Sequence, residues 1–144
     1  MNVINTAYDY KNDKFANLLG IEITEAGNGM AKGQLALKPH CKNALGTAHG
    51  GVMFALLDVV AACAAFRDNQ VRVVEFSHIN YIKIPPRETT LHAEVRLHQT
   101  FYHDTRETYV GNITDDEETL ICSIEIFAKI ISTNLESKVD AGRR

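Results

Sequence analysis

Cysteine is scarce in this chain of 144 residues, which contains only Cys41, Cys63 and Cys122. The number is odd, and the spacing matches neither a C-x-x-C pair nor a metal site, so the pattern indicates neither a disulfide framework nor a cysteine-bound metal. We therefore expect three free thiols in a reducing compartment.

Positive charge is also in short supply. Fifteen Lys and Arg stand against 18 Asp and Glu, which gives a formal net charge of −3. Proteins that bind nucleic acid need a basic patch or stripe to neutralise phosphates, and the sequence has none. We therefore exclude nucleic acid as the main partner.

No apolar run is long enough to cross a membrane, since a spanning helix needs roughly 20 apolar residues. The longest run, Val52 to Phe66, is shorter than this and is interrupted by Asp58. Residues 1–13 have neither the basic start nor the apolar stretch of a signal peptide. These absences predict a soluble, cytoplasmic protein with no membrane partner.

The chain length and a hydrophobic content of 45% suit a single domain with a real core. We assign residues 1–144 to one domain, with the core at about 12–131 and a polar, flexible tail at 132–144.

Two helices are expected. A short one carries Phe15 and Leu19, with Asn12 or Asp13 as its cap and Gly20 as its end. A long one, Gly50 to Phe66, has no polar face and is therefore expected to be buried on all sides.

About six strands accompany these helices. Two flank the glycine-rich turn Gly27-Asn28-Gly29, and four more are expected at Val71–Ile84, Thr89–Gln99, Thr105–Ile113 and Thr119–Ile131. Strands that follow one another through short turns indicate an antiparallel meander. Because one helix that is apolar all round needs a sheet curled about it, we predict an α+β fold, a curved antiparallel sheet wrapped around one long central helix.

Asp58 is the one charged residue inside the long apolar helix. An ionised carboxylate in such surroundings costs several kcal/mol unless it is paired, hydrated or functional. Asp58 is therefore either a candidate catalytic group or a buried polar group satisfied by a backbone N–H or a structural water.

The sequence around this helix resembles the hotdog-fold thioesterases, in particular the phenylacetate-pathway type of acyl-CoA thioesterase. The resemblance is carried by Pro39-His40-x-x-Asn43-x-x-Gly46-x-x-His49-Gly50-Gly51, by Phe54 and Leu57-Asp58, and by Ile79-Asn80-Tyr81-Ile82-x-x-Pro85. It implies hydrolysis of acyl-CoA by a homodimer, often a dimer of dimers (a homotetramer), with active sites at the subunit interface. It also implies that Asp58 is the nucleophile or general base, that the Gly50 amide binds the thioester carbonyl, and that Asn43 and His49 orient substrate or water. One departure is Val74, which lies where the family often has a Ser or Thr that holds the attacking water.

The chemistry of thioester hydrolysis agrees with this assignment. A developing oxyanion needs a donor such as an unpaired N–H at a helix N-terminus, where Gly50 and Gly51 lie. Eight residues separate Gly50 from Asp58, which is about 12 Å along a helix, so one carbonyl group cannot reach both in one chain. Two antiparallel copies of the helix would solve this, and we therefore expect a two-fold dimer.

The sequence also contains candidate substrate contacts. We expect the acyl group, an aryl or medium-length chain, to lie between the subunits near Gly51, Phe54, Leu57 and Tyr81. Lys83 and Arg87 are candidates for binding the phosphates of CoA. No cofactor is expected.

The sequence leaves several alternatives open. The protein could be a hotdog hydratase or dehydratase, or an acyl-CoA-binding protein without activity. His49 could only cap the helix, and Asn43 could only shape its loop. A metal site is not expected, because His92 and His98 lie about 20 Å apart along an extended strand.

Overall fold

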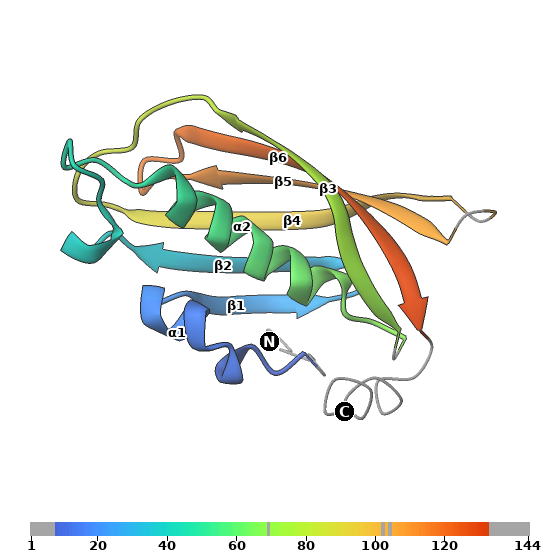
Figure 1. Cartoon of the computed structure of the whole chain (residues 1–144). Coiled ribbons are helices and arrows are strands. Elements are labelled where there is room, and N and C mark those ends of the chain that lie inside the picture. The colour runs from blue at the N-terminus through green and yellow to red at the C-terminus, as the bar shows by residue number, and fades with distance from the viewer. Residues whose placement is uncertain (1–7, 69, 102, 104, 133–144) are drawn as a thin grey trace.

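The computed structural model describes residues 8–68, 70–101, 103 and 105–132. Within these residues one long helix lies against a six-stranded antiparallel sheet (Figure 1), which confirms the predicted α+β fold. Residues 133–144 of the predicted tail lie outside the described residues. No helix in the described part of the chain is long and apolar enough to span a membrane.

The first helix, α1 (Lys14–Leu19), has the ends that the sequence predicts. The Asp13 carboxylate accepts a hydrogen bond from the Ala16 N–H at 2.9 Å, and Gly20 ends the helix in the left-handed region at φ +82°. The described residues also form two short 3-10 helices, η1 (Tyr10–Asn12) and η2 (Pro39–Cys41).

The sheet has the order β1-β2-β4-β5-β6-β3, and every neighbouring pair is antiparallel. The strands are β1 (Glu22–Gly27), β2 (Met30–Ala36), β3 (Val71–Tyr81), β4 (Thr90–Phe101), β5 (Arg106–Thr114) and β6 (Leu120–Ser132). The meander is confirmed for β4, β5 and β6 but is wrong for β3, which lies beside β6 at the sheet edge. The connection from β3 to β4 has to pass β6 and β5, which lie between these two strands in the sheet. It contains Pro85-Pro86, which favours an extended path and not a tight turn.

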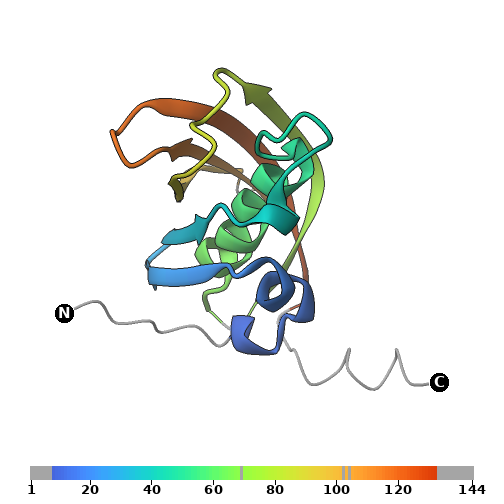
Figure 2. The same ribbon diagram turned by 90° about the vertical axis from the view of Figure 1, so that its left-hand side faces the viewer.

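The long helix, α2 (Gly50–Ala65), lies inside the curve of the sheet, as the end-on view in Figure 2 shows. Leu56, Leu57 and Val60 are fully buried against the inner face of the sheet. Burial on all sides, however, is wrong for the single chain, because the curved sheet covers only part of the helix circumference. A stripe of five residues spaced three or four apart stays exposed or half-buried: Gly51, Phe54, Asp58, Ala62 and Ala65. We call this set the open stripe.

The strand β3 forms an edge of the sheet. It pairs with β6 on one side, and no strand in the described part of the chain pairs with its other side. Val73, Val74 and Phe76 on this strand are exposed although they are apolar. The edge of β3 and the nearby open stripe are therefore both uncovered in the single chain. Apolar surfaces of this kind are typical of sites where another chain binds.

Candidate active site

The N-terminus of α2 offers one free backbone donor. The Gly51 N–H donates to His49 Nδ1 at 2.9 Å, and the Val52 and Met53 N–H groups donate to the His49 carbonyl at 3.0 and 3.3 Å. The Gly50 N–H has no hydrogen-bond partner among the described residues. Because the helix dipole adds positive character at this end, the Gly50 amide is suited to a carbonyl oxygen that gains negative charge.

His49 is the cap of this helix. Its backbone is extended at φ −69° and ψ +132°, and its Nδ1 accepts the hydrogen bond from Gly51. An accepting Nδ1 leaves the proton of a neutral imidazole on Nε2. The capping interpretation of His49 is therefore confirmed, and its predicted contact with substrate stays a prediction for the Nε2 side of the ring.

Asn43 shapes the loop that leads into α2. Its side-chain oxygen accepts hydrogen bonds from the N–H groups of Leu45 and Thr47 at 3.0 and 3.2 Å, and its amide donates to Thr47 Oγ1 at 2.9 Å. The Asn43 side chain thus holds residues 43–47 in an Asx-type turn. The structure gives it a local role in the loop, and direct contact with substrate stays a prediction.

Asp58 lies in the middle of the open stripe, two turns after Gly50. The side chain is exposed in the single chain, yet the neighbouring helix and sheet atoms displace enough water to raise the pKa of Asp58. The negative charge of Asp13 raises this pKa further. The carboxylate is therefore more basic than an ordinary aspartate, which favours proton abstraction or nucleophilic attack.

A cavity of about 130 Å³ opens beside Asp58, between α2, β3 and the inner face of the sheet. Apolar side chains make up most of its wall: Ala61, Ala62, Ala65, Val73, Val74, Ile126 and Ala128. Val74, the departure from the family pattern, thus lines the Asp58 cavity and brings no hydroxyl there. The polar members of the lining besides Asp58 are Arg72 and Tyr109.

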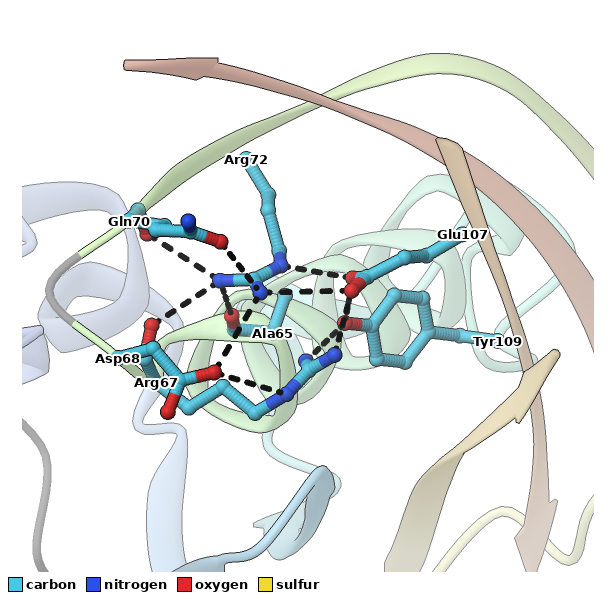
Figure 3. Close-up of polar contacts among 7 residues, drawn as sticks. All are labelled: Ala65, Arg67, Asp68, Gln70, Arg72, Glu107 and Tyr109. Carbon is cyan, nitrogen blue, oxygen red and sulfur yellow. Dashed lines mark hydrogen bonds and ion pairs between the residues drawn. The ribbon is translucent and has the colours of Figure 1, made fainter. Parts of the chain in front are cut away.

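Arg72 and Tyr109 belong to a buried polar network (Figure 3). Glu107 is only 2% exposed, and it accepts hydrogen bonds from Arg72 Nε at 2.7 Å and from the Tyr109 hydroxyl at 2.6 Å. Arg67 Nη1 donates to the Tyr109 hydroxyl at 2.6 Å, and its Nη2 donates to Glu107. Each strong donor and acceptor of this cluster is therefore engaged within the protein, which leaves a rigid wall beside the cavity.

The same network ends α2. Arg72 Nη1 donates to the Ala65 carbonyl at 3.1 Å and to the Arg67 carbonyl at 3.0 Å. A guanidinium at a helix C-terminus satisfies free carbonyls and complements the helix dipole. The network therefore connects the end of α2 to the first residues of β3 and to β5.

Arg72, Glu107 and Tyr109 were not predicted from the sequence. A signal for Glu107 was available: it shares the inward row of β5 with Tyr109 and Ile113, where a charge is out of place. Arg72 similarly interrupts an otherwise apolar start of β3.

The cysteines are not competing nucleophiles. All three are free and buried. Burial raises the pKa of Cys63 to about 12, with a further contribution from Asp13, and raises the pKa of Cys122 to about 11. These two thiols are therefore protonated at neutral pH and cannot act as thiolates.

The structure places the predicted substrate-contacting residues in different parts of the molecule. Phe54 lies on the open stripe with Asp58, whereas Leu57 is fully buried in the core and does not share that stripe. Tyr81 lies at the helix N-terminus, where its hydroxyl donates to the Gly50 carbonyl at 3.0 Å. Lys83 is exposed on the β3–β4 connection, and the Arg87 guanidinium lies beside Gly46, in the loop that precedes α2.

Histidine and acidic side chains do not gather into a metal-binding group in the part of the chain that the structure describes. His92 instead approaches Asp116, at 2.9 Å from Nε2 to Oδ1, on the solvent side of the sheet.

The chain is similar to known proteins in both sequence and structure. The model of the thioesterase superfamily matches residues 45–122. A protein of Archaeoglobus fulgidus that is named as an esterase is 34% identical over 114 residues, which cover 79% of this chain and 73% of that protein.

Solved structures have the same fold. The PaaI protein of E. coli, from the phenylacetic acid degradation operon, superposes with a TM-score of 0.80 at 22% identity and covers 85% of this chain and 88% of its own. A thioesterase protein of Streptococcus pneumoniae, solved with coenzyme A, has a TM-score of 0.77 at 22% identity and covers 88% of this chain and 97% of its own. The segment matched by the family model contains both Gly50 and Asp58 and extends into β6.

Proposed function

The chain belongs to the thioesterase superfamily and is a thioester hydrolase of hotdog fold, and on this premise we propose that it hydrolyses acyl-CoA at a site shared by two copies of the chain. Asp58 of one copy and the Gly50 amide of the other are the proposed catalytic groups. The products are the free acid and CoA, and an aryl or medium-chain acyl group is the proposed substrate class.

One observation carries this proposal. The N-terminus of α2 has a donor, the Gly50 N–H, without a partner among the described residues, and the same helix has one carboxylate, Asp58, on its open stripe. Thioester hydrolysis needs both functions, an electrophilic donor for the oxyanion and a base or nucleophile.

The separation of the two groups supports a two-fold arrangement. Eight helical residues span about 12 Å, whereas Gly50 must bind the carbonyl oxygen at about 3 Å and Asp58 must reach the carbon of the same group directly or through one water molecule. An antiparallel second copy of α2, packed on the open stripe, brings its own Gly50 toward Asp58. The bare edge of β3 supports the same partner, because pairing with a second β3 would cover both surfaces at once.

The proposed reaction proceeds by addition and elimination. Asp58 removes a proton from a water molecule whose oxygen attacks the carbonyl carbon, and the carbonyl electron pair moves onto oxygen, where the Gly50 amide stabilises it. The intermediate collapses by breaking the carbon–sulfur bond, and the CoA thiolate takes the proton from Asp58. Direct attack by the carboxylate, followed by hydrolysis of the anhydride, is the alternative route, and it uses the same two groups.

The surroundings of Asp58 support a compact apolar acyl group. The cavity wall consists mainly of alanine and valine, and its polar members, Arg72 and Tyr109, are engaged with Glu107. Lys83 and Arg87 remain the proposed contacts for the phosphates of CoA. Gly51 is proposed to contact substrate only through its exposed backbone, since its N–H is used by His49.

The decisive experiment is a panel of acyl-CoA thioesters assayed by thiol release, with wild type and Asp58→Asn in parallel. We expect turnover by wild type and a loss of about 100-fold or more in kcat for the variant, as for removal of a general base. Glu117→Gln, which removes an exposed carboxylate in the β5–β6 turn, is the control and should keep wild-type turnover. Equal turnover by Asp58→Asn and wild type would overturn the mechanism.

The Gly50 amide can be tested separately. Gly50 is the first helical residue, where proline fits, and the extended backbone of His49 suits a residue before proline. Gly50→Pro removes the N–H, whereas Gly50→Ala adds a Cβ at the same place and keeps it. We expect kcat of Gly50→Pro to be about 100-fold below that of Gly50→Ala.

A further inference from the structure

Two adjacent glycines at the start of α2 leave the direction of the Gly50 N–H poorly fixed by the backbone alone. Glycine is the most flexible residue, and helix ends fray, so the Gly50 N–H would not by itself keep one direction. The geometry around this pair shows how the direction is fixed.

The peptide group that joins Gly50 to Gly51 is held from both sides. Its carbonyl oxygen, that of Gly50, accepts a hydrogen bond from the Tyr81 hydroxyl at 3.0 Å. Its N–H, that of Gly51, donates to His49 Nδ1 at 2.9 Å. The preceding peptide is fixed as well, because its carbonyl, that of His49, accepts from Val52 at 3.0 Å.

Tyr81 also occupies the space that a side chain at position 50 would need. A Cβ built on Gly50 would lie 3.3 Å from Tyr81 Cζ and Oη and 3.4 Å from Cε1. The tyrosine ring therefore packs directly on the Gly50 Cα. Partial burial raises the pKa of Tyr81, with a further contribution from Cys122, so the hydroxyl stays protonated and able to donate at neutral pH.

The anchor of Tyr81 is the edge strand itself. Tyr81 is the last residue of β3 and pairs with Cys122 of β6, and the next two N–H groups, of Ile82 and Lys83, donate to the Ile121 carbonyl at 2.8 and 3.1 Å. Tyr81 thus connects the first residue of α2 to the sheet, which holds that residue in place.

We infer that Tyr81 is a positioning residue which, opposite His49, clamps the Gly50–Gly51 peptide and thereby aims the Gly50 N–H at the substrate carbonyl. This inference rests on the proposed function, and it replaces the expectation that Tyr81 contacts the acyl group. A displacement of about 1 Å in such a donor is enough to slow a reaction strongly.

The test is Tyr81→Phe, which keeps the ring and removes the hydroxyl. We expect kcat to fall about tenfold with KM within about twofold of wild type, because the donor is misaligned but still present. The backbone amide signal of Gly50 in a ¹⁵N–¹H NMR spectrum should shift. The acid limb of the pH–rate profile should not move, because Asp58 keeps its surroundings.

The control is Asn80→Ala on the neighbouring residue of β3, which removes a hydrogen bond to Ser123 Oγ of 3.2 Å. We expect wild-type kcat for it, and an equal loss in Asn80→Ala would assign the effect to β3 in general and overturn the inference. An increase in KM alone for Tyr81→Phe would also overturn it, in favour of a substrate contact.

A double substitution separates this inference from the proposed function. In the Gly50→Pro background, Tyr81→Phe should have no further effect, since no N–H is left to aim. A full tenfold loss in that background would overturn the role of Tyr81. Equal rates for Gly50→Pro and Gly50→Ala would instead show that the Gly50 amide has no part in the mechanism. A slow Gly50→Pro together with wild-type kcat for Tyr81→Phe would leave the Gly50 amide in the mechanism and overturn only the role of Tyr81.

Discussion

Asp58 is held where its charged form is unfavourable. Neighbouring atoms exclude part of its water and Asp13 adds a repulsive charge, and both effects raise its pKa. A group of this kind reduces the stability of the folded state at neutral pH, which is a common feature of catalytic residues. The proposed function uses the same property, because a carboxylate with a raised pKa is a stronger base.

The pH dependence of the rate should report this pKa. Asp58 must be ionised to act, so we expect kcat/KM to fall as the pH drops through a value above 3.8, the ordinary pKa of an aspartate. Asp13→Asn should move this acid limb to lower pH, because it removes the repulsive charge, while asparagine still caps α1. Rate profiles of the two proteins from pH 3 to 8 make the comparison, and an unmoved limb would contradict it.

Stability should respond in the opposite direction to activity. Because the folded state raises the pKa of Asp58, the ionised carboxylate destabilises the protein above the ordinary pKa, and this penalty disappears as the pH falls below it. Asp58→Asn should therefore unfold at a higher temperature than wild type at pH 7 and at the same temperature near pH 3. A lower Tm at pH 7 would indicate a structural role for the carboxylate.

At the scale of elements, α2 and β3 are connected by polar contacts at both ends. Tyr81 donates to the first carbonyl of α2, and Arg72 donates to the carbonyl of its last residue, Ala65. The helix that carries the proposed catalytic groups is thus fixed lengthwise to the strand at the sheet edge. Any shift of β3 would move both ends of the helix with it.

The buried network should contribute much of this rigidity. Burial alone would raise the pKa of Glu107, but hydrogen bonds from Arg72 and Tyr109 and the charges of Arg67 and Arg72 hold it below its ordinary value of 4.5. The stabilisation by Glu107 is therefore present above pH 4.5 and is lost as the pH falls through the lower, folded-state pKa.

Glu107→Gln should destabilise the protein by about 3–5 kcal/mol at pH 7. It leaves the buried Arg72 and the half-buried Arg67 with the exposed Asp68 carboxylate, 3.9 and 3.8 Å away, as their remaining counter-charge among the described residues. Glu94→Gln is the matched control, because Glu94 pairs with Lys32 and Arg96 on the solvent side of the sheet. It should cost at most about 1 kcal/mol. Urea unfolding of the three proteins measures both values, and similar losses for the two variants would contradict the assignment.

The positions of the helices and strands in the sequence were largely predictable, whereas the order of the strands in the sheet was less so. The hairpin around Asn28, the caps of α1 and the extent of α2 follow from local spacing, which depends on residues close together in the chain. The edge position of β3 depends on a crossover whose path local patterns do not contain. The network of Arg67, Arg72, Glu107 and Tyr109 joins residues up to 42 positions apart, so no local signal could predict its contacts.

The candidate site was predictable to the same degree. Gly50 and Asp58 stand out as a helix start and a misplaced charge. The partners of His49 and Asn43 are local as well, but the sequence left their capping and loop roles as alternatives. The contact of Tyr81 with Gly50 spans 31 positions and was missed for that reason.

At the scale of the whole molecule, the proposed shared site makes a strict prediction. Asp58→Asn and Gly50→Pro should each be nearly inactive alone, because every site in each homodimer lacks one group. After the two are unfolded together and refolded, half of the dimers should be hybrids with one complete site of two, so about a quarter of wild-type activity should return. No recovery in a mixture that contains hybrids would show that both groups act within one chain.

The bare edge of β3 also has a consequence for newly made chains. Until the proposed dimer forms, the chain carries an edge strand with one unpaired side and with exposed Val73, Val74 and Phe76, which can pair with any extended segment in a crowded cell. Slow synthesis or strong dilution would prolong this exposure. Aggregation during production should therefore be worst at low chain concentration with foreign protein present, and co-translational encounter of two copies would protect against it.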